Sequence, residues 1–340
     1  MGASQLTRSY LFLILLLLHY ASSGTHLIRS VVDTISSPFQ RCYPQRRLAI
    51  LRFIANRQYR GHMDMPQNTF FTLEQAASLA RQTHAACRDI AMHTTQPLCF
   101  SHITALKLHG MAASMDLRPG FDENKLHVSV SQAGRLSHLR DVRFHLWSKD
   151  PSPVILDELV NCMPAADAIC QMASYTDLTS LVIAMDWLTC RNPDMKMMSH
   201  AELAEHVQGL GRFPGVRLCR QALSYSREGT DSPQESLLRL SAEKYGIPKL
   251  TVNMPIMDYE LGKAYVVDMA LPEYDIVIEY DGRHHYTMER WEADLAKRNR
   301  LSALGKTTFV ATKVTMANSH NLNAFLAMIA QEIGRRKNGG

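Results

Sequence analysis

The sequence lacks the cysteine patterns that mark disulfide-stapled domains and structural zinc sites. Its seven cysteines are odd in number and unevenly spaced, and they form neither a CxxC pair nor a zinc-type spacing with histidine. None follows Cys219, so the last third of the chain contains no cysteine. We therefore expect neither a disulfide framework nor a zinc site, and we expect the cysteines to act as small packing residues.

A hydrophobic run long enough to cross a membrane is also missing. The run from Tyr10 to Leu18 has nine residues, whereas a bilayer core needs about 20. Small residues follow it, a pattern typical of a short signal peptide, so secretion stays open. We favour the alternative that translation starts at Met63 or Met65 and that residues 1–62 are a doubtful extension, because the arginine-rich stretch 41–60 is unlike the start of a secreted domain. We then expect a cytoplasmic protein without a membrane partner.

The two expected domains also carry no excess of positive charge. The formal net charge is +5, but residues 1–61 carry eight basic residues and one acidic residue. Residues 62–226 carry 14 basic residues against 16 acidic ones, and residues 227–340 carry 15 of each. Electrostatic attraction to a polyanion therefore rests on the doubtful extension.

The length of 340 residues allows two globular domains. The polar stretch 226–232 has the composition of a linker, and it divides residues 63–226 from residues 227–340. The first domain is predicted to be mixed α/β and to serve recognition or regulation. Its predicted elements are a helix from Thr72, strands at 126–131 and 142–148, helices at 167–173 and 178–188, and a helix after the capping box Ser199–Glu202.

The second domain shows a compact order of elements. They are a helix at 233–244, strands at 250–257, 264–271 and 275–281, a helix at 288–304, a strand at 307–312 and a helix at 322–335. A helix, three strands in a meander, a helix, a strand and a helix predict an α/β sandwich around a small mixed sheet. Three helices suffice to cover both faces of that sheet.

Acidic residues stand at the ends of two apolar strands in this domain. Asp268 ends AYVVD and Glu279 ends DIVIE, with Asp281 two residues later. Side chains alternate along a strand, so Glu279 and Asp281 should share a face, and the short connection after Leu271 should bring Asp268 close to Glu279. Carboxylates held together need a cation or a proton, and Mg²⁺ favours such a set. The alternative is that they are solvated acids at strand ends.

Other polar residues near this centre allow two interpretations each. Glu235 is the third residue of a helix that opens with Ser232 and Pro233, so helix capping explains it as well as a catalytic role does. Asp294 and Arg298 lie four apart on a helix and suit an exposed ion pair. His284 and His285 suit a proton shuttle or a phosphate contact, although a surface histidine pair is usually neither.

The stretches SPQESLLRL, YGIP, VVDMALPEYDIVIEYDGRHHY and DLAKRNRLSALG, within about residues 227–315, resemble a known family. It is the endonuclease-like family related to the very-short-patch-repair (Vsr) mismatch endonucleases, within the PD-(D/E)xK nuclease superfamily. The resemblance implies a restriction-endonuclease-like sandwich that binds Mg²⁺ or Mn²⁺ and cuts DNA.

Carried over by position, the resemblance makes Asp268 and Glu279 the metal ligands, with Asp281 in the same acidic centre. It makes His285 a candidate general acid or base and Glu235 a supporting acid. It also gives the Asp294 and Arg298 helix a structural or substrate role. The superfamily lysine is missing, because the position two after Glu279 holds Asp281. Its task would fall to Lys297, Arg283 or His285.

The upstream region, about 64–226, resembles the domain related to AbiEi-type antitoxins that precedes such nucleases in actinobacterial proteins. The stretches that carry the resemblance are FTLEQAASLA, LCFSHITALKLHGM, LHVSVS, VRFHLW and AADAICQMASYTDLTSLVIAMDWL. The resemblance implies a winged-helix-like recognition or regulatory module, although its net charge does not favour DNA binding.

The expected function is therefore metal-dependent hydrolysis of phosphodiester bonds in DNA, with Lys297, Arg298, Arg300 and Arg283 near backbone phosphates. The rival expectation is a non-catalytic DNA-binding or antitoxin-like regulator that retains the nuclease fold. DNA against RNA, the cutting pattern and the oligomeric state stay open at this point.

Overall fold

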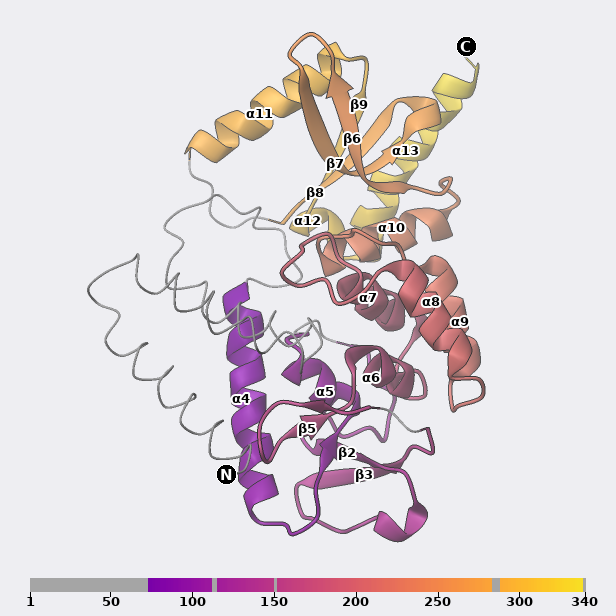
Figure 1. Cartoon of the computed structure of the whole chain (residues 1–340). Coiled ribbons are helices and arrows are strands. Elements are labelled where there is room, and N and C mark those ends of the chain that lie inside the picture. Colours follow the sequence, from indigo (N-terminus) through magenta and orange to yellow (C-terminus); the bar gives the residue numbers. More distant parts are fainter. Residues whose placement is uncertain (1–72, 112–114, 150–151, 283–287, 339–340) are drawn as a thin grey trace, which may run out of the picture. The chain divides into compact units, whose positions relative to one another are not determined.

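The structure is a computed structural model, and it describes residues 73–111, 115–149, 152–282 and 288–338 (Figure 1). The chain divides into two units, residues 1–64 and 65–340, so every described residue belongs to the second. The extension 1–62 therefore lies outside the described residues. The described part is an α/β fold with two mixed sheets, which confirms the expected α/β class. None of its helices is both long and apolar enough to pass through a bilayer.

The first sheet has the strand order β3-β2-β1-β5-β4. The strands are β1 (Cys99–Phe100), β2 (Leu126–Val130), β3 (Val142–Leu146), β4 (Val154–Ile155) and β5 (Asn161–Cys162). β2 and β3, both predicted, pair in parallel, and the connection between them contains the 3₁₀ turn η1 (Ala133–Arg135). The two-residue strands were not predicted, because they are too short to show an alternating pattern.

Helices accompany this sheet in the order α4 (Leu73–Met92), α5 (His102–Leu108), α6 (Ala165–Met172), α7 (Leu178–Leu188), α8 (His200–Gly209) and α9 (Val216–Tyr225). α8 begins with the predicted capping box, in which the Ser199 hydroxyl accepts from Glu202 N–H and the Glu202 carboxylate accepts from Ser199 N–H. The apolar faces of these helices share one core with the sheet. The six cysteines in the described ranges are free, and all but Cys99 are buried, as expected for packing residues.

The second sheet has the order β6-β7-β8-β9, with two antiparallel pairs and a parallel β8-β9 pair. Its elements are α10 (Pro233–Tyr245), β6 (Thr251–Asp258), β7 (Lys263–Leu271), η2 (Pro272–Tyr274), β8 (Ile276–Asp281), α11 (Met288–Ala303), β9 (Thr307–Thr312), α12 (Lys313–Met316) and α13 (Ser319–Asn338). The predicted order of helices and strands is confirmed, and the short α12 is an addition.

Helices cover both faces of this sheet. Leu238 and Ala242 of α10 and Phe325 and Ile329 of α13 pack on one face, where Ile278 belongs to the same cluster. Leu301 of α11 packs with Val277 on the other face. Figure 1 shows α11 and α13 on opposite sides of the strands. The sheet is therefore buried between helices on its two faces. Polar side chains meet at the ends of its strands, which lie at the rim of the sheet.

Candidate functional site

Asp268 and Glu279 face each other where the pairing of β7 with β8 ends. The last paired residues are Met269 and Ile278, so the same register continued by one residue sets Asp268 opposite Glu279. The Asp268 carboxylate reaches across, and its Oδ2 accepts a hydrogen bond of 2.8 Å from the Tyr280 N–H. Directly opposite residues of an antiparallel pair lie on one face. The two acids therefore converge at the end of the ladder.

The pleat of β7 is broken at Asp268 itself. Val267 packs with Leu301 of α11, whereas Met269 packs with Leu238 of α10, although alternate residues of a regular strand share a face. Asn253 of β6, which lies beside this position, has a positive φ of 47°, and its side-chain amide donates to the Gly229 carbonyl. The distortion turns the Asp268 carboxylate toward the neighbouring strand rather than into either core.

Glu235 both caps α10 and belongs to the electrostatic surroundings of Asp268. Its Oε2 accepts from the Asp231 N–H at 3.1 Å and its Oε1 accepts from the Ser232 hydroxyl at 2.9 Å, while its own N–H donates to that hydroxyl at 3.2 Å. The side chain is buried. Burial, followed by the charge of Asp268, raises the pKa of Glu235 well above its ordinary range. The capping role is therefore present, and it places the acid beside Asp268.

The pKa of the Asp268 carboxyl group reflects its burial and the charged groups around it. Burial raises its pKa from 3.8 to about 6, and the Tyr280 N–H opposes that shift. The negative charge of Glu279 contributes to the raised pKa, and the positive charge of Lys297 opposes it. A largely buried group of carboxylates in this state favours a proton or a cation at its centre.

Lys297 supplies the one ammonium group that binds this pair of acids within the described residues. It extends from α11, is half-buried, and donates from Nζ to Glu279 Oε1. Lysine was expected two positions after Glu279, where the chain has Asp281 instead. The helix therefore brings a lysine to the same carboxylate from a different place in the sequence.

Asp281 lies on the same side of β8 as Glu279 and meets the next residue of α11. Arg298 Nη2 donates to Asp281 Oδ2 at 3.4 Å, so this arginine is directed to Asp281 rather than to Asp294 in the same helix. Arg300 binds Asp258 and Glu260. All three basic residues proposed for phosphate contacts on α11 thus pair with carboxylates. Arg283, His284 and His285 lie outside the described residues.

Asp231 belongs to the centre although sequence reasoning placed it in a linker. Its charge raises the pKa values of Asp268 and Glu235, and Arg191 binds its carboxylate. The signal that could have found it is its place next to the Ser232 cap, one residue before a helix that carries a buried acid.

The donor atoms suit a hard cation that keeps part of its water. Neither Asp268 Oδ1 nor Glu279 Oε2 accepts a hydrogen bond from a described residue, and Mg²⁺ often binds one or two carboxylates together with waters. In the described ranges no three His, Cys, Asp or Glu side chains are grouped so as to hold a metal ion by themselves. Within the described residues, each of the two carboxylates therefore keeps one oxygen that accepts no hydrogen bond.

Comparisons of the chain with models of protein families, with curated proteins and with solved structures find no match. The resemblance to Vsr-related nucleases and to AbiEi-type domains consequently stays a prediction from the residues quoted above.

Proposed function

We propose that the protein is a metal-dependent endonuclease that hydrolyses phosphodiester bonds in DNA, with its centre at Asp268, Glu279 and Lys297. The observation that carries the proposal is the meeting of the first two carboxylates at the end of the β7–β8 ladder, with Lys297 delivered to Glu279 by α11. The choice of DNA follows the resemblance to the Vsr-related family.

In this proposal Asp268 and Glu279 hold Mg²⁺ or Mn²⁺. The bound cation would polarise the phosphate and lower the pKa of an attacking water. The Tyr280 N–H keeps Asp268 in place, and Glu235 holds the start of α10 against the centre. Lys297, once Glu279 binds the cation, has an ammonium group beside the reacting phosphate, where it orients water and offsets the developing charge.

The layers around the sheet support the same proposal. A helix, a three-stranded antiparallel meander, a helix and a parallel fourth strand, with α10 and α13 on one face and α11 on the other, suit the restriction-endonuclease-like sandwich that the resemblance implies.

One observation favours the rival function, a DNA-binding or antitoxin-like regulator without catalysis. Lys297 already neutralises Glu279, and Arg298 and Arg300 of α11 are paired with acids. The centre is therefore balanced without a cation, as it would be in a scaffold that has lost activity.

Incubation of the full-length chain with supercoiled DNA and either Mg²⁺ or Mn²⁺ tests the proposal. We expect nicked or linear product, and a loss of about 100-fold or more in rate for Asp268→Asn and for Glu279→Gln. Lys297→Met should lower the rate by about 10- to 100-fold, because it removes a charge that acts mainly on the transition state.

Glu273→Gln is the matched control, since Glu273 is an exposed acid of η2 between the same two strands. It should cleave at the wild-type rate. Cleavage that survives in Asp268→Asn, or its absence from the wild type with both ions, contradicts the nuclease assignment. A preference for RNA in a parallel assay would keep the centre and change the substrate.

A further inference from the structure

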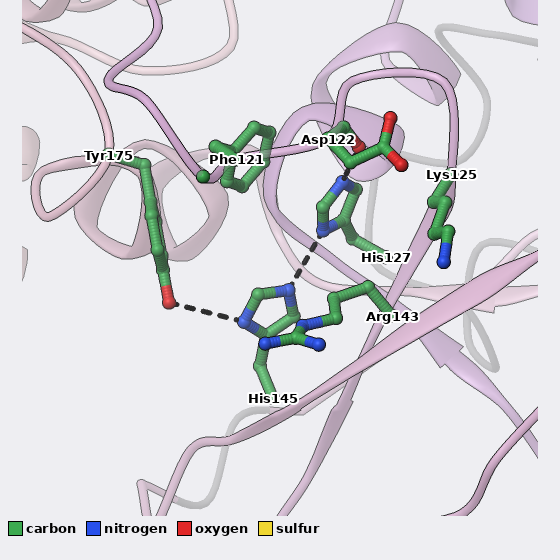
Figure 2. A pocket seen from close by; sticks show the side chains of 8 residues that line it. Phe121, Asp122, Lys125, His127, Arg143, His145 and Tyr175 are labelled. Carbon is green, nitrogen blue, oxygen red and sulfur yellow. Dashed lines mark hydrogen bonds between the residues drawn. The ribbon is translucent and has the colours of Figure 1, made fainter.

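A second constellation lies away from these acids, at the first sheet. A pocket of about 240 Å³ opens over β2 and β3, and none of its residues was singled out from the sequence. Figure 2 shows its lining, which includes His127 of β2, Arg143 and His145 of β3, and Tyr175 after α6. One small cavity is thus lined by two imidazoles, an aromatic ring and a guanidinium group.

When both rings are neutral, the hydrogen-bond chain that contains these histidines has only one consistent direction. His127 Nε2 lies 2.9 Å from the Asp122 carbonyl oxygen, which can only accept, so this nitrogen carries the proton. His127 Nδ1 is then an acceptor, and His145 Nε2, 2.8 Å away, must be its donor. His145 Nδ1 is left to accept from the Tyr175 hydroxyl at 3.3 Å. Figure 2 marks all three bonds.

Stacked rings hold both imidazoles of the chain. Phe121 lies flat on His127, with ring centroids 4.2 Å apart and planes 1° apart, and His102 stacks on His145 at 3.9 Å. His102 has a positive φ of 53°, which costs a non-glycine residue about 1–2 kcal/mol. Gln171 accepts its N–H at 3.1 Å. The fold therefore tolerates local strain to keep this ring on His145, as often happens at functional sites.

The imidazoles of this pocket are neutral at physiological pH. The pKa of His127 is lowered to about 4 and that of His145 to about 3; burial is the largest cause, and the positive charge of Arg143 contributes to both shifts. The histidines consequently contribute fixed dipoles, and the charge of the pocket comes from other residues.

Two cations supply that charge. Lys125 and Arg143 line the pocket, and the side chain of neither residue forms a hydrogen bond or an ion pair with any described residue. The Asp122 carboxylate also lines it and accepts from the Asn124 N–H at 3.1 Å. Two positive charges against one leave the pocket cationic. The guanidinium group, without a partner, presents donors that fit the paired oxygens of a carboxylate or a phosphoryl group.

From these features we infer that the pocket binds a small molecule through an anionic phosphoryl or carboxylate group, held by Arg143 and Lys125. The aromatic faces of Phe121 and Tyr175 take the apolar part of the ligand. The Tyr175 oxygen, which donates its proton to His145, keeps a lone pair for a ligand donor. The volume lies below the about 300–1,000 Å³ of drug-sized sites, so the ligand is compact.

A metal ion between the two histidines is the alternative occupant, and the geometry disfavours it. The facing nitrogens are 2.8 Å apart, whereas two nitrogens bound to one tetrahedral zinc ion lie about 3.3 Å apart. Within the described residues no third histidine, cysteine or acid completes such a group. Binding of zinc to these histidines would therefore contradict the inference.

The test uses the full-length chain labelled with ¹⁵N at histidine, whose two-bond ¹H–¹⁵N spectra report tautomer and protonation. We expect both His127 and His145 to be neutral with the proton on Nε2 at pH 7. Titration with inorganic phosphate, and separately with acetate, should move both sets of signals in a saturable way with at least one probe. The probe that binds more tightly identifies the anionic group.

Arg143→Gln should weaken that binding by about tenfold or more, since it removes a charge-assisted hydrogen bond. Arg140→Gln is the matched control, because Arg140 is exposed, three residues away, and does not line the pocket. It should leave the affinity unchanged. An absence of saturable shifts with either anion, equal weakening by both variants, or binding of Zn²⁺ to the histidines without anion binding would each overturn the inference. The imidazole spectrum of each variant also reports whether the pocket has kept its fold.

Discussion

Asp268 has a raised pKa because it is buried close to other acids. Only part of these surroundings could be predicted from the sequence. Strand alternation and the short β7–β8 connection were enough to predict that it meets Glu279. The contribution of Lys297 was not predictable in detail, because it depends on how α11 crosses the sheet. Asp231 was missed because a polar stretch before a helix has linker composition whether or not it folds back.

The raised pKa of Asp268 makes a prediction about stability. Between about pH 4 and 6 the folded chain holds this proton more tightly than the unfolded chain does, so stability is lost as the pH rises through that window. Asp268→Asn removes the ionisation while Asn Oδ1 still accepts from the Tyr280 N–H. We expect the variant to be about 1–3 kcal/mol more stable than the wild type at pH 8, and equal to it near pH 4.

Urea unfolding of both proteins at pH 4, 6 and 8 measures the difference. A variant that is less stable than the wild type at pH 8 would show that the Asp268 carboxylate stabilises the fold and does not destabilise it. Addition of Mg²⁺ should raise the wild-type stability at pH 8 and leave Asp268→Asn unchanged, since a bound cation relieves the repulsion only where the ligand is present.

At the scale of elements, the predictable features were those with a strong periodic or capping signal. Helices and strands of the second sheet begin and end close to their predicted positions, and the parallel pairing of β2 with β3 was not foreseen. Parallel neighbours depend on the path of the 131–141 connection rather than on the pattern of either strand. The pocket over β2 and β3 depends on that same pairing.

Substitutions at the start of α10 can distinguish a capping role of Glu235 from a catalytic role. Ser232→Ala removes the hydroxyl that accepts from the Glu235 N–H and should cost about 1 kcal/mol of stability. Glu235→Gln keeps an acceptor for the cap and removes an ionisable group that is buried beside Asp268, so its stability should equal or exceed that of the wild type. Thermal unfolding and the cleavage assay, run on both variants, distinguish the roles. Full activity in Glu235→Gln would reduce Glu235 to a capping residue.

The turn before α9 predicts a position where glycine is required. Gly215 has a φ of 82°, and a Cβ there would lie 2.6 Å from the Ala173 carbonyl carbon of the segment after α6. Gly215→Ala should therefore lower stability by about 2–4 kcal/mol. Gly209→Ala serves as the control, since Gly209 ends α8 with open space around it and should be neutral or slightly stabilising. Similar melting temperatures for the two variants would contradict the close approach.

At the scale of the whole described unit, α10 joins the two cores. Its Leu238 packs with the second sheet, and its Leu240 packs against the first core. Arg239 between them is fully buried and donates from Nη2 to Asp186 Oδ2 of α7 at 2.9 Å. The Ser236 hydroxyl donates to the same oxygen at 2.7 Å. The domain boundary predicted near residue 226 therefore lies beside a shared helix.

Removal of one charge from this pair should destabilise both cores together. Arg239→Met leaves Asp186 buried without its ion partner, which typically costs about 3–5 kcal/mol. Arg335→Met, which removes an exposed arginine from an ion pair with Glu332, should cost less than about 1 kcal/mol. Denaturant unfolding followed by tryptophan fluorescence measures both. An Arg239→Met protein as stable as Arg335→Met would show that the two cores do not depend on this pair.

Binding of Mn²⁺ by the full-length chain, measured by electron paramagnetic resonance with Asp268→Asn, Glu279→Gln and Glu273→Gln alongside, tests the central claim most directly. We expect one bound ion in the wild type and in Glu273→Gln, with binding lost in the other two variants. A wild-type chain that binds no Mn²⁺, or binding that persists in both Asp268→Asn and Glu279→Gln, would contradict a metal centre at these carboxylates.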